Sequence, residues 1–283
     1  MLLLVDLDGV VYRASEAVPG VGPALAARVA LGDVVVYVTN NAMHHHLDYL
    51  PRLAGHGAPV GPDRVMTSAL ASALWIREHR PEVRRVLCVG AAGLERELRE
   101  AGFAVVTAAD AAMRMEREDL DGWEAADHPD AVVVGLDPAM AYLRIAVAAD
   151  CVRAGALFVA TNRDPIYPTE RGFRPGAGTI VAAIVAAGGR EPDAVIGKPG
   201  PHLLEEGARM AAANLAGGVM IGDSPTDVAA GKAAGLRTIL ILTGVTSRAA
   251  ADALAPADRP TRVAADAAEL TVVLAEMAAE VNG

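Results

Sequence analysis

Short apolar runs alternate with longer stretches in which an apolar residue recurs every three or four positions, and the alternation continues along the whole chain. Runs rich in Val, Leu and Ile are typical of buried strands, and the longer period is typical of helices that cover them. This alternation predicts an α/β fold with parallel sheets. The expected strands are 2–5, 34–38, 64–67, 86–90, 103–106, 131–135, 157–161, 194–197, 218–222 and 237–242. The expected helices lie near 20–31, 44–55, 68–79, 92–101, 139–154, 177–187, 201–213, 225–234, 247–254 and 266–280.

Four polar clusters each come directly after an apolar run of strand type. They are Asp6-Leu-Asp8-Gly, Thr39-Asn40-Asn41, Lys198-Pro-Gly-Pro and Gly222-Asp223-Ser-Pro-Thr-Asp227. In an open parallel sheet, ligands bind beyond the carboxyl ends of the strands, so we expect the four clusters to converge on one site. Carboxylates, a hydroxyl, amides and an ammonium suit a divalent metal and a phosphoryl group.

The clusters also predict the domain organisation. Two precede and two follow a middle block of strands and helices that contains none of them. We therefore expect one catalytic domain formed by 1–80 and 190–283, with a second α/β domain inserted at 81–189. The strand at 194–197 is expected to resume the first domain, and a polar, acidic stretch at 107–130 to link the halves of the inserted one.

Asp6 and Asp8 point to the same side of an extended backbone. Two carboxylates held together repel unless a cation or a proton lies between them, and magnesium prefers such oxygen ligands. One carboxylate then serves as a nucleophile and the other as an acid and base. The alternative is a turn with exposed aspartates, made possible by Gly9.

Each remaining cluster has two interpretations. Thr39, Asn40 and Asn41 either hold phosphate oxygens or cap the following helix. Lys198 either neutralises a phosphate or is an ordinary exposed lysine. The pair Asp223 and Asp227 either faces a metal or marks a helix start, with Pro at the first helical position. Their joint occurrence at strand ends favours the catalytic interpretation.

The difficulty of the reaction also favours a composite site. Enzymes accelerate phosphate-monoester hydrolysis by up to ~10²¹-fold, whereas one general base contributes only ~10²–10⁴-fold. A nucleophile, a metal, a charge clamp and an acid are needed together, and the four clusters provide one of each.

Composition excludes other classes. The 283 residues are 53% hydrophobic and carry a formal net charge of −10 without a basic stripe, so nucleic acid is not an expected partner. No run approaches the ~18 apolar residues that span a bilayer. Cys88 and Cys151 show no paired spacing, which is typical of a reducing, cytoplasmic setting.

These motifs together resemble the haloacid dehalogenase superfamily of aspartate-nucleophile phosphatases. The closer similarity is to its NagD-like branch, which includes nitrophenyl, phosphoglycolate and glycerol-phosphate phosphatases. The segments that carry the similarity are DLDGV, TNN, ATNRDPIYPTERGFRPGAG at 160–178, GKPGP and LTGV at 242–245.

The resemblance implies a mechanism. Asp6 attacks phosphorus and forms an aspartyl-phosphate, while Asp8 protonates the leaving oxygen and then activates water. Thr39 and Asn40 hold phosphate oxygens, and Lys198 neutralises charge.

The resemblance further implies a Rossmann-like, doubly wound core with an α/β cap between the second and third motifs. It implies magnesium as the cofactor, held by Asp6, the Asp8 carbonyl and Asp223, with Asp227 in support. Here one residue fewer than is usual in the branch separates Asp223 from Asp227, so the role of Asp227 stays open between a direct and a water-mediated contact. Relatives commonly dimerise through their caps, so a homodimer is possible.

Two segments lie outside the four clusters. His44, His45 and His46 cannot readily chelate one ion from a single helix face, so a solvated helix start is expected there. The stretch 162–174 resembles the substrate-facing cap loop of the branch, as opposed to a merely rigid Pro-rich connection. The residues expected to contact the leaving group are Asn162, Arg163, Asp164 and Tyr167.

The predicted function is therefore hydrolysis of a small phosphorylated metabolite with magnesium. Two alternatives stay open. One is a phosphotransferase or mutase of the same superfamily, and the other is a signalling phospho-acceptor, although receiver domains lack a large insert between these residues.

Overall fold

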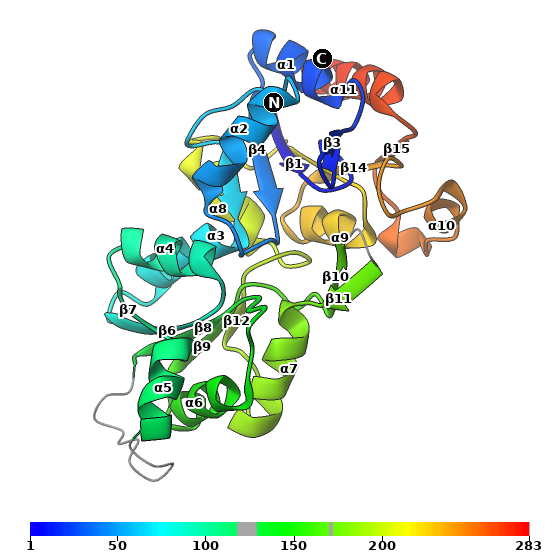
Figure 1. The fold of residues 1–283 in the computed structure, drawn as a ribbon. Coiled ribbons are helices and arrows are strands. Elements are labelled where there is room, and N and C mark those ends of the chain that lie inside the picture. Colours follow the sequence, from blue (N-terminus) through cyan, green and yellow to red (C-terminus); the bar gives the residue numbers. More distant parts are fainter. Residues whose placement is uncertain (118–128, 170–171, 283) are drawn as a thin grey trace. The chain divides into compact units, whose positions relative to one another are not determined.

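The computed structural model describes residues 1–117, 129–169 and 172–282. Internal contacts divide the chain into two compact units (Figure 1). The first unit comprises 1–39, 46–66 and 198–283, and the second comprises 40–45 and 67–197. The second unit is thus inserted into the first in sequence.

The first unit is built on a six-stranded sheet with the order β15-β14-β13-β1-β4-β5. Its strands are β1 (Leu2–Asp6), β4 (Val34–Thr39), β5 (Val65–Thr67), β13 (Val219–Gly222), β14 (Arg237–Ile241) and β15 (Arg262–Ala264). Neighbours from β15 to β4 run parallel. The chain moves from β1 toward β5 on one side and later from β13 toward β15 on the other. The order therefore reverses beside β1, where sheets of this class bind ligands.

Helices cover both faces of this sheet. Leu3 and Val5 of β1 share one core with the apolar side of α1 (Val21–Ala30) and α11 (Ala267–Asn282). Leu4, which points to the opposite face, lies against Gly207 of α8 (His202–Met210). The other helices of the unit are α2 (Leu50–Gly55), α9 (Pro225–Ala233) and α10 (Arg248–Asp252), with 3-10 turns η1 (His46–Tyr49) and η3 (Pro256–Asp258) and a small hairpin of β2 (Tyr12–Arg13) and β3 (Glu16–Ala17). Because helices cover both faces of the sheet, its strands carry apolar residues on both faces.

The second unit has its own parallel sheet with the order β12-β9-β8-β6-β7. The strands are β6 (Arg85–Val89), β7 (Ala104–Thr107), β8 (Ala131–Val134), β9 (Leu157–Ala160) and β12 (Ala194–Val195). Its helices are α3 (Ser68–His79), α4 (Ala92–Glu100), α5 (Ala108–Arg117), α6 (Tyr142–Arg153) and α7 (Ala177–Gly188). An antiparallel hairpin of β10 (Ile166–Thr169) and β11 (Gly172–Pro175) precedes α7. The α/β class predicted from the alternation is confirmed, as is the Rossmann-like core that the resemblance implies.

One local prediction was wrong, and two further segments contain elements that the sequence did not predict. The strand near 194–197 does not resume the first sheet, because β12 pairs with β9 of the second unit. The stretch 107–130 begins with a helix, α5, whose buried Ala108, Ala111 and Met115 contribute to the second core. Within and just after the stretch 162–174, Ile166–Thr169 and Gly172–Pro175 pair as the antiparallel strands β10 and β11, which the sequence did not predict. Trp123, expected within the linking stretch, lies outside the described residues.

Candidate active site

The parallel register of the first sheet brings the first and fourth clusters together. Val5 of β1 pairs with Ile221 of β13, so Asp6 ends its strand beside the residue that precedes Asp223. On the other side of β1, Asp6 pairs with Val38, which places Thr39 one residue further along the neighbouring strand. Asp6, Thr39 and Asp223 are all buried. Strand register thus places residues of the first, second and fourth clusters at the carboxyl edge of this sheet.

Lys198 of the third cluster contacts carboxylates of the first and fourth clusters. Its Nζ lies 2.6 Å from Oδ1 of Asp6 and 2.6 Å from Oδ1 of Asp227. Only 4% of Lys198 is exposed, so the ammonium depends on these two carboxylates in place of water. Burial alone would lower the pKa of Lys198, but the charges of Asp227 and Asp6 outweigh burial and raise it. Lys198 is therefore a fixed cation and not an ordinary exposed lysine.

The buried carboxylates of Asp6, Asp223 and Asp227 form a cluster with excess negative charge. One oxygen from each lies within 4.8 Å of the others. Burial raises the pKa of Asp6 well above its usual value, and Lys198 opposes this only in part. Burial, reinforced by Asp227, raises the pKa of Asp223 to about 6. Three carboxylates facing one ammonium fit a hard divalent cation such as magnesium, which takes oxygen ligands and relieves the repulsion.

Asp227 serves the helix as well as the site. Its Oδ2 accepts hydrogen bonds from the Ser224 backbone N–H (3.1 Å) and hydroxyl (2.6 Å), which completes a capping box at the start of α9. Its other oxygen, Oδ1, accepts from Lys198. The motif thus starts a helix, and both oxygens of Asp227 have protein partners, while its metal-facing role stays a prediction.

The loop around LTGV supports the metal side of the site. Oδ2 of Asp223 accepts the backbone N–H of Val245 at 2.7 Å, and the Thr243 hydroxyl donates to the Gly9 carbonyl at 2.7 Å. Gly9 adopts a positive φ of 81°, and a Cβ there would lie 2.2 Å from Oδ2 of Asp223. Glycine is thus needed at position 9 because the chain turns back beside this carboxylate.

Asp8 differs from Asp6 in exposure. The Asp8 side chain reaches solvent, while Asp6 is buried at the end of β1. Neighbouring atoms still displace enough water to raise the pKa of Asp8, and the charges of Arg52 and Lys198 act in the opposite direction. One aspartate is therefore fixed among charges and the other is open to solvent, which is the asymmetry that a nucleophile and a proton carrier require.

The two asparagines after Thr39 belong to the second unit, where their side chains contact protein. Oδ1 of Asn41 accepts the backbone N–H of Met43 at 2.9 Å, which is a local turn. Nδ2 of Asn40 donates to Oδ2 of Asp164 at 2.9 Å. The phosphate-binding role predicted for these two side chains stays a prediction.

The four residues expected to contact a leaving group have different surroundings. Asn162 is buried and donates from Nδ2 to the Asn40 carbonyl at 2.8 Å. Arg163 is exposed and forms an ion pair of 2.5 Å with Glu191. Tyr167 lies on β10 and is half-buried. Three of the four, Asn162, Arg163 and Asp164, thus make contacts inside their own unit that the sequence did not predict.

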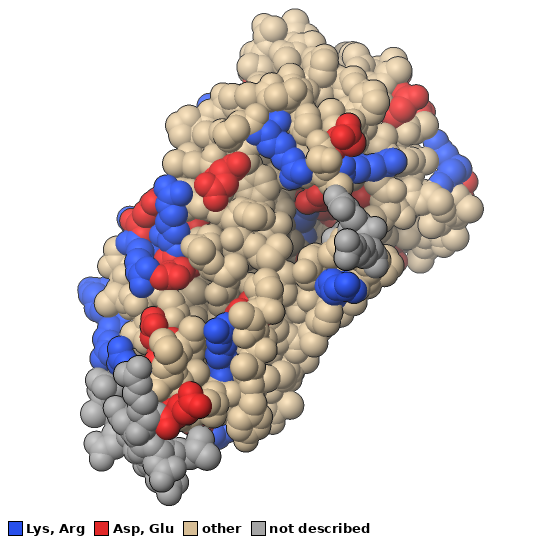
Figure 2. Space-filling model, in the orientation of Figure 1, with Lys and Arg blue, Asp and Glu red and all other residues tan. Residues whose placement is uncertain are grey.

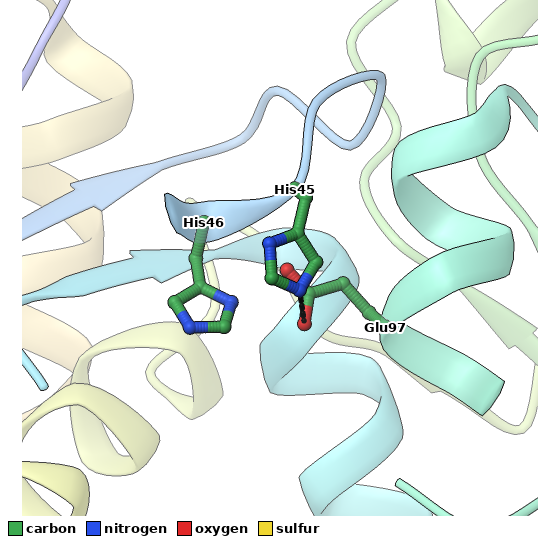
Figure 3. A group of neighbouring side chains, drawn as sticks. All are labelled: His45, His46 and Glu97. Atoms are coloured by element: carbon green, nitrogen blue, oxygen red, sulfur yellow. Dashed lines mark ion pairs between the residues drawn. The ribbon is translucent and has the colours of Figure 1, made fainter. Parts of the chain in front are cut away.

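The histidine run is not the solvated helix start that the sequence predicts. His44 is exposed, but His45 is 1% exposed, and the 3-10 turn begins only at His46. Nε2 of His45 lies 3.5 Å from Glu97 and 3.0 Å from Glu100, and Figure 3 shows its ring turned toward Glu97. The acidic partners lie on α4, far along the chain.

Charged side chains are interspersed on the face shown in Figure 2, and no basic stripe crosses its described part. Within the described ranges, no helix is long and apolar enough to cross a bilayer.

Comparisons with known proteins agree with this geometry. A model of the haloacid dehalogenase-like hydrolases matches residues 3–104, and a model of related HAD-like hydrolases matches 195–270. D-glycerol 3-phosphate phosphatase of Mycobacterium tuberculosis is 36% identical over 93% of this chain and 69% of its own length. Phosphoglycolate phosphatase 2 of Arabidopsis thaliana is 33% identical over 86% and 83%.

Solved structures of phosphatases also match this chain. The p-nitrophenyl phosphatase from Archaeoglobus fulgidus matches with a TM-score of 0.84 and 29% identity, covering 96% of this chain and 98% of its own. A glycerol phosphate phosphatase from Mycobacterium tuberculosis, solved in complex with magnesium, matches with a TM-score of 0.79 and 34% identity, covering 95% and 76%. The chain belongs to the haloacid dehalogenase-like hydrolases, and its assignment to the NagD-like phosphatases of that superfamily is confirmed.

Proposed function

We propose that this protein is a magnesium-dependent phosphomonoester hydrolase that acts on a small phosphorylated metabolite through an aspartyl-phosphate on Asp6. The observation that carries the proposal is the buried Lys198 ammonium, 2.6 Å from Asp6 and 2.6 Å from Asp227, beside the third carboxylate of Asp223. The named activities of relatives, on glycerol phosphate, phosphoglycolate and nucleotides, support a small substrate.

In the first step, Lys198 holds Oδ1 of Asp6, and Oδ2 attacks phosphorus. The new Oδ2–P bond forms as the bond from phosphorus to the leaving oxygen breaks, and Asp8 gives its proton to that oxygen. In the second step, Asp8 takes a proton from water as the water oxygen attacks phosphorus. The Oδ2–P bond then breaks, which releases inorganic phosphate and restores the Asp6 carboxylate.

Three groups would hold magnesium: the carboxylates of Asp6 and Asp223 and the backbone carbonyl of Asp8. Asp227 supports them through Lys198 and α9. When bound, the ion neutralises the negative charge that builds up around phosphorus. Thr39, at the end of β4, supplies a hydroxyl to a phosphate oxygen, and Lys198 supplies positive charge.

We further propose that the inserted domain, predicted at 81–189, is a cap whose residues select the leaving group while the first unit performs the chemistry. The β10–β11 hairpin carries exposed Ile166 and Phe173 together with Tyr167, a surface suited to contact an organic leaving group. A homodimer formed through this domain is part of the same proposal.

The direct test is phosphate release from a panel of phosphorylated metabolites, with magnesium and with a chelator. Release of free phosphate without an added acceptor supports a hydrolase and contradicts a phosphotransferase. A phospho-aspartate that persists without hydrolysis would instead indicate a signalling module.

Magnesium is expected to stabilise the wild-type protein and not the Asp223→Asn variant. A ligand present at 100 times its Kd raises the free energy of unfolding by about 2.7 kcal/mol. The amide of the variant still accepts the Val245 N–H but lacks the charge that attracts the ion. Thermal unfolding with and without magnesium measures this difference. The control Asp252→Asn, at an exposed position, should show the wild-type increase in unfolding midpoint with magnesium. An equal increase in Asp223→Asn would contradict the proposal that Asp223 binds the metal.

Tyr167→Ala is expected to change the ranking of substrates more than the turnover of p-nitrophenyl phosphate. The residue lies on the hairpin and not among the charged groups that act on phosphorus, so its loss should alter contacts with leaving groups. Values of kcat/KM across the metabolite panel measure the effect. A uniform loss for every substrate would contradict the proposed division of labour.

A further inference from the structure

The chain passes between its two units at residues that adjoin the proposed catalytic groups. Thr39 ends the first segment of the first unit, and Asn40 begins the second unit. Gly197 ends the second unit, and Lys198 returns the chain to the first. Single peptide bonds therefore join Thr39 to Asn40 and Gly197 to Lys198. Whatever fixes Asn40 and Gly197 also restricts two of the groups proposed to handle phosphate.

Asn40 is fixed by hydrogen bonds at both its backbone and its side chain. Its carbonyl accepts from Nδ2 of Asn162 at 2.8 Å and from the Ser68 hydroxyl at 2.7 Å. Its side-chain amide donates to Oδ2 of Asp164 at 2.9 Å. These partners come from segments 28 to 124 residues away, so the contacts arise from the folded unit and not from a local turn.

Gly197 is held against the same group of residues. Its N–H donates to the Thr161 carbonyl at 2.8 Å. A Cβ at position 197 would lie 2.5 Å from Oδ1 of Asn40, 2.6 Å from the Thr161 carbonyl oxygen and 2.9 Å from Cβ of Asn162. The absence of a side chain at Gly197 therefore lets the two crossing segments touch, with Asn40 on one and Gly197 on the other.

Asp164 is itself held by its own neighbours. Its N–H donates to Oδ1 of Asn162 at 3.1 Å, and its carbonyl accepts the N–H of Gly178 in the first turn of α7 at 2.9 Å. The carboxylate that receives the Asn40 amide thus belongs to a backbone anchored to a helix. A hydrogen bond to a charged acceptor is also roughly twice as strong as one between neutral groups.

We propose that Asn40, Asn162 and Asp164 form a clasp that holds the two crossing segments together and thereby positions Thr39 and Lys198. The inference rests on the proposed phosphatase function. It makes Asp164 and Asn162 positioning residues and not contacts for the leaving group, the role that the sequence suggested for them. Catalysis is sensitive to such positioning, because a displacement of about 1 Å can cost ~10²-fold in rate.

The test exchanges the two partners of the Asn40–Asp164 hydrogen bond. Asn40→Asp places two carboxylates at the 2.9 Å contact, whereas the double variant Asn40→Asp with Asp164→Asn restores one carboxylate and one amide with their positions reversed. Asp164→Ala removes the acceptor, and Asp164→Asn keeps one. We would measure kcat and KM with magnesium for p-nitrophenyl phosphate and glycerol 3-phosphate, and thermal unfolding for all variants. Glu191→Gln, at an exposed neighbouring position, is the control.

A clasp requires that Asp164→Ala lowers kcat by roughly 10- to 100-fold for both substrates alike with KM changed much less. It also requires that Asp164→Asn retains more activity than the alanine variant and that the double variant recovers at least about tenfold over Asn40→Asp alone. Glu191→Gln should match wild type. The unfolding midpoints identify variants that lose activity only because they unfold at the assay temperature.

Two results would overturn the clasp. One is a loss in Asp164→Ala that differs strongly between the two leaving groups, since that is the behaviour of a substrate contact. The other is a double variant no more active than Asn40→Asp, since the side chain at position 40 would then act on phosphate directly. A wild-type protein that releases no phosphate would refute the proposed function instead. In that case, comparison of the unfolding midpoints of the single and double variants would still show whether positions 40 and 164 are coupled.

Discussion

Asp6→Asn is expected to abolish phosphatase turnover, by at least ~10³-fold, without weakening the fold. An amide has the shape of the carboxylate and can still accept the Lys198 hydrogen bond through Oδ1, but it cannot attack phosphorus. The substitution also removes one of three mutually repelling buried carboxylates. We therefore expect the metal-free unfolding midpoint of the variant to be no lower than that of wild type.

Initial rates with p-nitrophenyl phosphate measure the loss of turnover, and thermal unfolding measures the stability of the variant. Asp63→Asn, which changes an exposed aspartate of the same unit, is the matched control and should behave as wild type in both. Full activity in Asp6→Asn would refute the assignment of the nucleophile. Lost activity together with a sharply lower midpoint would mean that Asp6 is structural.

Lys198→Met is expected to damage stability and activity together. Without the ammonium, the carboxylates of Asp6 and Asp227 lose their common partner in a buried setting, and breaking such a pair costs about 3–5 kcal/mol. Loss of one charge-stabilising donor at a reacting centre typically lowers kcat by about 10²–10³-fold. Because a divalent cation also neutralises carboxylates, magnesium should narrow the stability gap between variant and wild type.

Chemical denaturation with and without magnesium, together with kcat, measures these effects. Lys232→Met is the control, since Lys232 is exposed and its Nζ contacts only the Ala257 carbonyl among the described hydrogen bonds. A Lys198→Met protein as stable as wild type without metal would contradict the pairing that underlies the site.

Strand ends of the first sheet could be predicted from the sequence because they are encoded locally. An apolar run followed by polar residues marks where a strand stops, and parallel pairing then brings such ends to one edge. Asp6 and Asp223 meet for that reason, whereas Lys198 follows β12 of the other sheet and Asp227 lies in α9. One oxygen of Asp227 caps α9 and the other pairs with Lys198. This division depends on side-chain geometry, and the periodicity of the sequence carries no information about it.

What the sequence did not predict depends on contacts between distant segments. The pairing of His45 with Glu97 joins a residue before η1 to the helix α4, and the hydrogen bond from Asn40 to Asp164 spans 124 residues. Neither contact can be predicted from the local pattern of apolar and polar residues. The helix α5 is different, because Ala108, Ala111 and Met115 recur at helical spacing, and the acidic character of the longer stretch obscured that signal.

The membership of β12 has a consequence for exchanging inserted domains among relatives. A chimera joined at 80/81 and 189/190 would take β12 from one parent and its partner β9 from the other, so a mismatched strand pair would form at that edge of the sheet. It would also take residue 40 from one parent and residue 164 from the other, so a mismatched pair would meet there. An exchange that comprises residues 40–45 and 67–197 is expected to keep both pairs within one parent.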